Sequence, residues 1–240
     1  MNEIIRSLHN RKSVRVYEDR EISAAIKREI LLAAMAAPSA GNQQLYTILD
    51  ITDQGIKDRL AITCDNQPFI AKAPMVLIFL ADCQKWYDAY SAYSCNPRQP
   101  GVGDLLLAVS DCNIAAQNAV TAAESFGIGS CYIGDVMERC EEHRQLLSLP
   151  PYVFPAAMLV FGYPTPQQKA RKKPERCELK YIVHENGYRR MDPAAFPEML
   201  QKHSGTQEFQ EWINAFCARK YNSDFAKEMT RSVAEYLRQF

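Results

Sequence analysis

At 240 residues, the chain is long enough to bury a sizeable hydrophobic core within one domain. Hydrophobic residues make up 47% of it, and 28 Lys and Arg balance 28 Asp and Glu, as is typical of globular proteins. Because the formal net charge is zero, neither a nucleic-acid partner nor a polybasic membrane anchor is expected. We expect a single domain over residues 1–240 with peripheral additions.

The N-terminal residues 1–19 are charged throughout and contain no apolar stretch, so neither a signal peptide nor a transit peptide is predicted. The longest apolar run, residues 73–81, contains Pro74 and is too short for a membrane span. The sequence therefore predicts a cytoplasmic protein. Its 8 cysteines include no Cys-x-x-Cys pair and its 4 histidines are scattered. We expect no metal site and cysteines packed as small hydrophobic residues, a redox-active or Fe–S role being the alternative.

In the N-terminal half, Ser23 can cap a helix whose apolar residues follow at helical spacing until Pro38 ends it. Strands are predicted at residues 45–52 and 75–81, the second apolar on both faces as in the centre of a sheet. A helix over residues 54–64 separates them. The segment 82–103 is the expected lid, with aromatic side chains that stack on a substrate or merely pack.

In the C-terminal half, a long helix over residues 104–126 is expected to end at Gly127. Its many alanines would let a second subunit approach closely, and a core helix of one domain explains them equally well. Strands are predicted at 131–133 and 156–163, with a helix over 136–149 between them. A basic loop at 163–178 and a helical extension over 207–240 follow. The pattern indicates an α+β fold of about four strands.

The segment Arg11, Lys12, Ser13 and Arg15 has the composition that a phosphate site needs. Arginine offers forked donors that match phosphate oxygens, and Ser13 adds a hydroxyl. Taken alone, the same cluster also describes a solvated surface patch. The basic loop, with Arg171, Lys173 and Arg176, could close on the same phosphate or remain solvated.

Polar and glycine-containing loops form the other candidate segments. Residues 37–44 (APSAGNQQ) could present donors and acceptors to a planar heterocycle, or serve as an ordinary turn after the helix. Residues 127–135 (GIGSCYIGD) could let backbone N–H groups approach a cofactor. They lack the glycine spacing and the preceding strand of a Rossmann dinucleotide site, and no Walker A sequence is present.

Taken in chain order, RKSVRVY, APSAGNQQ, NQPFIAKAP, GIGSCYIGD, and FGYP followed by a basic loop and IVHENGY resemble the nitroreductase family. The closing SDFAKEMTRSVAEYL resembles a bacterial subgroup of it. The resemblance implies an α+β, three-layer fold with a central mixed or antiparallel sheet flanked by helices. It also implies an intertwined homodimer whose FMN sites draw on both subunits.

The resemblance further implies the residues of the cofactor site. Arg11 would bind the FMN phosphate, and Ser13 and Arg15 would lie near the N1 and O2 edge of the flavin, where a cation stabilises an anionic hydroquinone. Lys12 could remain a solvated charge. The expected cofactor-binding residues are Arg11, Lys12, Ser13, Arg15, Pro38, Ser39, Asn42, Gln44, Gln67, Tyr132, Ile133, Gly134, Asp135, Arg171, Lys173 and Arg176.

The implied activity is an FMN-dependent oxidoreductase that passes hydride from NAD(P)H through flavin N5 to nitroaromatic, quinone or related acceptors by a ping-pong mechanism. No catalytic side chain is required. Enone reduction, dehalogenation or dehydrogenation on the same scaffold is one alternative. A flavin-binding redox sensor without turnover, with Cys83 or Cys95 as the responsive thiol, is another.

Overall fold

The computed structural model describes residues 1–240, which form two compact units. The first unit comprises residues 1–171 and 228–240, and the second comprises residues 172–227. Whether they act as the single expected domain stays a prediction. None of the helices combines the length and apolarity that crossing a membrane requires.

A four-stranded antiparallel sheet forms the centre of the first unit, with strand order β1-β2-β4-β3. The only parallel pairing near it is an isolated bridge between Ser13 and Ser130. The sheet consists of β1 (Tyr46–Asp50), β2 (Met75–Asp82), β3 (Gly129–Ile133) and β4 (Val153–Gly162). The expected strands are therefore confirmed within a few residues of their predicted ends.

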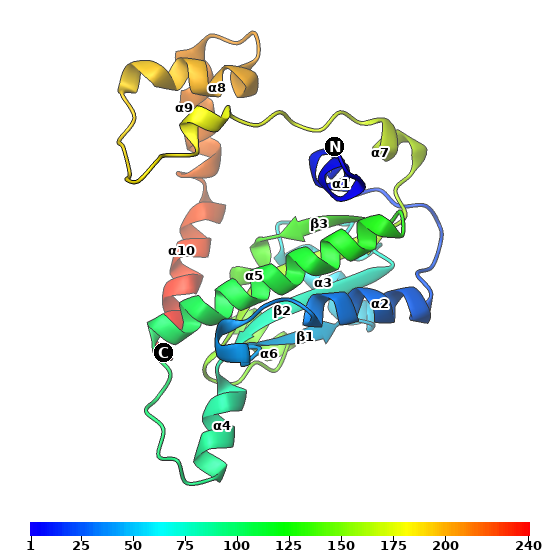
Figure 1. The fold of residues 1–240 in the computed structure, drawn as a ribbon, viewed down its shortest axis with the longest axis vertical. Coiled ribbons are helices and arrows are strands. Elements are labelled where there is room, and N and C mark those ends of the chain that lie inside the picture. The colour runs from blue at the N-terminus through cyan, green and yellow to red at the C-terminus, as the bar shows by residue number, and fades with distance from the viewer. The chain divides into compact units, whose positions relative to one another are not determined.

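Helices cover both faces of this sheet. In Figure 1, α5 crosses one face with α2 beside it, and α3 lies behind the sheet. Because β2 and β4 are buried at every position, both of their faces must be covered. The α+β, three-layer architecture is thus confirmed. The helices and short 3-10 turns of this unit are α1 (Glu3–Asn10), α2 (Ala24–Met35), η1 (Ala40–Asn42), α3 (Gln54–Thr63), α4 (Gln84–Ala92), α5 (Val102–Ser125), η2 (Asp135–Met137), α6 (Cys140–Leu146) and α7 (Pro166–Ala170).

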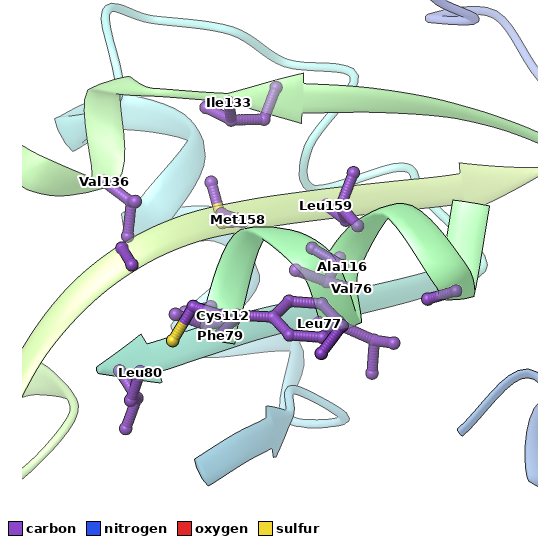
Figure 2. Close-up of a cluster of buried hydrophobic side chains, with 14 of the residues drawn as sticks. Val76, Leu77, Phe79, Leu80, Cys112, Ala116, Ile133, Val136, Met158 and Leu159 are labelled. Carbon is purple, nitrogen blue, oxygen red and sulfur yellow. The ribbon is translucent and has the colours of Figure 1, made fainter. Parts of the chain in front are cut away.

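The core lies between α5 and the two central strands. Figure 2 shows Phe79 of β2, Cys112 and Ala116 of α5, and Leu159 of β4, which lie in this layer. Met158, the preceding residue of β4, points to the opposite face of the sheet. The small side chains of α5 let the helix lie close to the sheet, which agrees with the core reading of its alanines.

Several local signals act as the sequence predicts. The Ser23 hydroxyl accepts a hydrogen bond from the N–H of Ile26 at 3.3 Å and starts α2. Gly127 has a φ of +71°, which ends α5 in the left-handed region that glycine adopts at little cost.

The helix expected over 136–149 is shorter than predicted. Residues 135–137 form the 3-10 turn η2, and α6 starts only at Cys140. Arg139 has a φ of +48°, and this left-handed residue separates the turn from the helix. The loop expected at 163–178 also contains the short helix α7.

The second unit is helical. It contains η3 (Leu179–Tyr181), η4 (Pro193–Ala195), α8 (Phe196–Ser204) and α9 (Phe209–Lys220), and α10 (Asp224–Leu237) starts in it and ends in the first unit. Residues 209–220 and 224–237 of the helical extension predicted over 207–240 are helical, and α8 is a helix that the sequence does not predict. Trp212 and Phe216 of α9 stack with ring centroids 5.0 Å apart.

Candidate functional site

The segment that carries the basic cluster lies against strands β3 and β4. The N–H of Val14 donates to the carbonyl oxygen of Ser130 at 2.9 Å. A Cβ on Gly129 would overlap the side chain of Val14, so a larger residue in β3 would push the segment away. Val14 is buried, which anchors the neighbouring polar residues at the edge of the sheet.

Two nitrogens of the Arg11 guanidinium lack hydrogen-bond partners. Its Nε and Nη2 atoms are buried without a hydrogen-bond partner, and the group lies 5.6 Å from the ring centroid of Tyr132. Burial raises the pKa of Tyr132 to about 12, so its phenol stays neutral. Because unpaired buried donors are costly, this arrangement suits an anion such as a phosphate.

Lys12 is tethered and is not a free solvated charge. Its ammonium donates to the carbonyl oxygens of Lys169, at 2.6 Å, and Arg171. In return, Nη2 of Arg171 donates to the carbonyl oxygen of Ser13 at 2.6 Å. These bonds join residues 11–13 to the segment that follows β4, so Lys12 and Arg171 both shape the neighbourhood of Arg11.

Arg15 lines a groove of about 790 Å³. Its guanidinium lies 5.8 Å from the ring centroid of Phe69, and Tyr17 and Lys72 contribute to the same groove. This volume falls within the range of small-molecule sites. Phe69 was not among the expected site residues.

The loop after β3 is held by Gln67. The amide nitrogen of Gln67 donates to Oδ2 of Asp135 and to the carbonyl oxygen of Cys64, both at 2.9 Å. Ile133 is buried, Gly134 is exposed, and the Tyr132 hydroxyl donates to Oε1 of Gln117 at 3.4 Å. The structure thus brings Gln67 and the end of β3 together.

The segment 38–44 forms a constrained turn between α2 and β1. Asn42 and Gln44 have φ values of +56° and +51°, in the left-handed region that side chains other than glycine seldom adopt. Ser39 accepts the Gln44 N–H through its hydroxyl at 3.0 Å, and Pro38 is exposed beside it. Further hydrogen bonds join the segment to α2, α4 and α5 and, through the Gln44 carbonyl, to Tyr46 of β1.

Asp111 of α5 is the main anchor of this turn. Its carboxylate, 3% exposed, accepts the N–H of Ala40 at 3.0 Å and that of Leu45 at 3.2 Å. Sequence reasoning missed this residue. The available signal was a carboxylate within the apolar stripe of a helix expected to be buried on more than one side.

The expected lid contains α4 and packs on the same turn. The Trp86 indole donates to the carbonyl oxygen of Gln43 at 2.7 Å, and the Gln43 amide donates to the Tyr90 hydroxyl at 3.2 Å. A pocket of about 400 Å³ lies between them and also contacts Cys83. Burial raises the pKa of the Cys83 thiol to about 12, which makes this thiol a poor redox sensor.

Lys173 and Arg176 belong to the second unit, and their roles toward a phosphate stay predictions.

Cys95 is exposed, in contrast to the buried Cys83.

The family model described as the nitroreductase family matches residues 8–163, which is more than half of the chain. The chain belongs to the nitroreductase family. This nitroreductase-family chain is 30% identical over 238 residues to an FMN reductase [NAD(P)H] of Bacillus subtilis (strain 168), covering 98% of the chain and 91% of that relative. It is also 32% identical over 207 residues to an oxygen-insensitive NADPH nitroreductase of Salmonella typhimurium, covering 85% of the chain and 83% of the relative.

Solved structures agree with these relatives. NfrA2 of B. megaterium is 27% identical and superposes with a TM-score of 0.83, covering 98% of each chain. The fold expected of a nitroreductase family member is therefore confirmed.

Proposed function

We propose that this nitroreductase family member binds FMN and uses NAD(P)H to reduce nitroaromatic, quinone or related acceptors. The observation that carries the proposal is the half-buried Arg11, two of whose guanidinium nitrogens are buried without a hydrogen-bond partner. The relatives named as an FMN reductase and an NADPH nitroreductase support the same assignment. We place the enzyme in the cytoplasm, where NAD(P)H is available.

The residues around Arg11 fit FMN. Arg11 would hold the phosphate, since charge-assisted hydrogen bonds are the strong ones, and Ser13 would lie beside Arg15 at the ring. Arg15 would place a positive charge near the N1 and O2 edge of the ring, which favours an anionic reduced form. Bound FMN would accept hydride at N5 and pass it on, which is the basis for expecting ping-pong kinetics.

We propose a homodimer in which the segment 38–44 completes the partner's site. Its strained turn makes no hydrogen bond to the Arg11 cluster of its own chain and is held rigid by Asp111. Helices α1 and α5 also expose large apolar side chains, as an interface would require. These are Ile4, Ile5 and Leu8 of α1, and Val102, Leu106, Leu107 and Ile114 of α5.

The purified protein should be yellow, take up FMN in a 1:1 ratio with the chain, and lose its flavin absorbance when NADH or NADPH is added without oxygen. Adding a nitroaromatic or a quinone should restore the absorbance. A colourless protein that takes up no FMN and oxidises neither nicotinamide with any acceptor would refute the proposal.

A further inference from the structure

The side-chain amide of Gln67 has a defined orientation. Both of its partners are oxygens, namely Oδ2 of Asp135 and the carbonyl oxygen of Cys64, each 2.9 Å from Nε2. A carboxylate and a backbone carbonyl accept hydrogen bonds, so a flipped amide would bring oxygen against oxygen. The nitrogen must therefore face Asp135 and Cys64. Both N–H groups are used, and Oε1 is the polar atom left to meet a ligand.

The segment that carries Asp135 is fixed from the same side. A ring nitrogen of His143, Nδ1, lies 2.9 Å from the carbonyl oxygen of Val136, and Nε2 lies 2.8 Å from the Thr63 hydroxyl. His143 is fully buried, and burial lowers its pKa and keeps the ring neutral. The Val136 carbonyl can only accept, so Nδ1 carries a proton and donates to it. Asp135 is thus held next to Gln67 by α3 and α6.

We propose that Asp135 is a positioning residue that fixes the amide of Gln67, so that this side chain offers the cofactor a hydrogen-bond acceptor and never a donor. The inference rests on the proposed FMN site. An N–H group of the flavin ring can then donate to Oε1 of Gln67, while a ring carbonyl in the same place would be repelled by it. Replacing Asp135 by Asn weakens this selection, because an Asn side chain can pair with either orientation of the Gln67 amide and only the Cys64 carbonyl then favours the native one.

The test titrates the FMN-free full-length protein with FMN and with riboflavin, and follows flavin fluorescence. We expect D135N to weaken the binding of both ligands by about 3–10-fold, the loss of one hydrogen bond. Riboflavin lacks the phosphate, so equal effects on both ligands assign the change to the ring. The control is D65N, which removes an exposed carboxylate two residues before Gln67 and should change both affinities by less than about 2-fold.

A double-variant cycle tests whether Asp135 acts through Gln67. In the Q67A background, D135N should have no further effect on the dissociation constant, because no amide is left to orient. The visible absorption band of bound FMN should shift in D135N and Q67A alike and stay unchanged in D65N. Thermal melting of each variant without ligand checks that the fold is intact.

The inference is overturned if D135N and D65N weaken binding equally, or if D135N weakens it by the same factor with and without Gln67. It is also overturned if D135N weakens FMN binding but not riboflavin binding. If the unaltered protein binds neither flavin, the proposed function itself fails. This outcome is measured without any variant.

Discussion

At the scale of single residues, Arg11 lowers the stability of the folded protein while the candidate site is empty. A guanidinium with buried, unpartnered nitrogens is unfavourable until an anion arrives. Lys12, next in the chain, already has its hydrogen bonds within the protein. Neighbouring cations therefore have different roles, which composition alone does not separate.

We predict that Arg11→Met weakens FMN binding by about 10–100-fold, the expected loss of hydrogen bonds to a charged phosphate. Riboflavin binding should be unchanged. The stability of the FMN-free protein should be equal or higher, because two buried nitrogens without hydrogen-bond partners are removed. Fluorescence titration and urea unfolding measure these effects, with exposed Arg6→Met as the control. A similar loss of riboflavin binding would contradict the phosphate assignment.

Glu138 is a second buried residue that lowers the stability of the fold. It is 5% exposed, and its Oε1 atom has no hydrogen-bond partner. Burial, together with nearby Asp135 and Asp65, raises the pKa of this carboxyl to about 7. The folded protein therefore keeps a proton that the unfolded chain releases above its ordinary pKa of 4.5.

The stability contribution of Glu138 should accordingly be present below the unfolded pKa and be lost as pH rises through about 7. We predict that Glu138→Gln removes this dependence, so that the variant gains about 2 kcal/mol over the unaltered protein between pH 5 and pH 8. Urea unfolding at both pH values measures it, with exposed Glu185→Gln as the control. Parallel pH profiles for the protein and Glu138→Gln would show that the carboxyl is ionised in the fold.

At the scale of elements, α5 does more than fill the core. Through Asp111 it holds both ends of the turn at 40–45, in which Asn42 and Gln44 adopt left-handed conformations. Such strained backbone persists only where the surroundings over-determine it. The turn also receives the Trp86 indole of α4, so two helices fix its shape.

We predict that Asp111→Asn lowers the free energy of unfolding by about 2 kcal/mol, because its new N–H₂ group faces one of two backbone N–H donors. Trp86 fluorescence should change in the folded state, since the indole binds the same turn. Urea unfolding measures the first effect. Ser110→Ala, at the neighbouring exposed position of α5, is the control and should cost less than about 0.5 kcal/mol.

At the scale of the whole molecule, the exposed apolar residues of α1 and α5 suit contact with a second copy. Leu106 is 63% exposed although it lies on the main core helix. We predict that Leu106→Glu shifts the protein from dimer to monomer and lowers FMN occupancy, because a buried unpaired charge opposes association. Sedimentation velocity measures the state. The control Leu179→Glu, at an exposed position of the second unit, should leave the oligomeric state unchanged. A monomeric unaltered protein would refute the prediction.

Much of the local structure follows from the sequence. The Ser23 cap, the apolar run at 75–81 and Gly127 locate a helix start, a central strand and a helix end, because short-range sterics and hydrogen bonding decide these features. Patterning failed at residues 136–149, where a left-handed Arg139 interrupts a stretch with helical periodicity. That conformation depends on tertiary contacts, including the bond from its own N–H to Glu228 of α10.

The ordered motifs by themselves determined the family, the α+β class and the cationic segment 11–15. Only the tertiary structure decided that Arg11 is unpartnered, that Lys12 is tethered, that Asp111 anchors the turn and that Asp135 orients Gln67. The physical reason is sequence separation: the Asp111 and Asp135 contacts join residues 71 and 68 positions apart. The role of a buried charged or polar side chain depends on the hydrogen-bond partners that the fold brings to it, and the local sequence pattern carries no information about these partners.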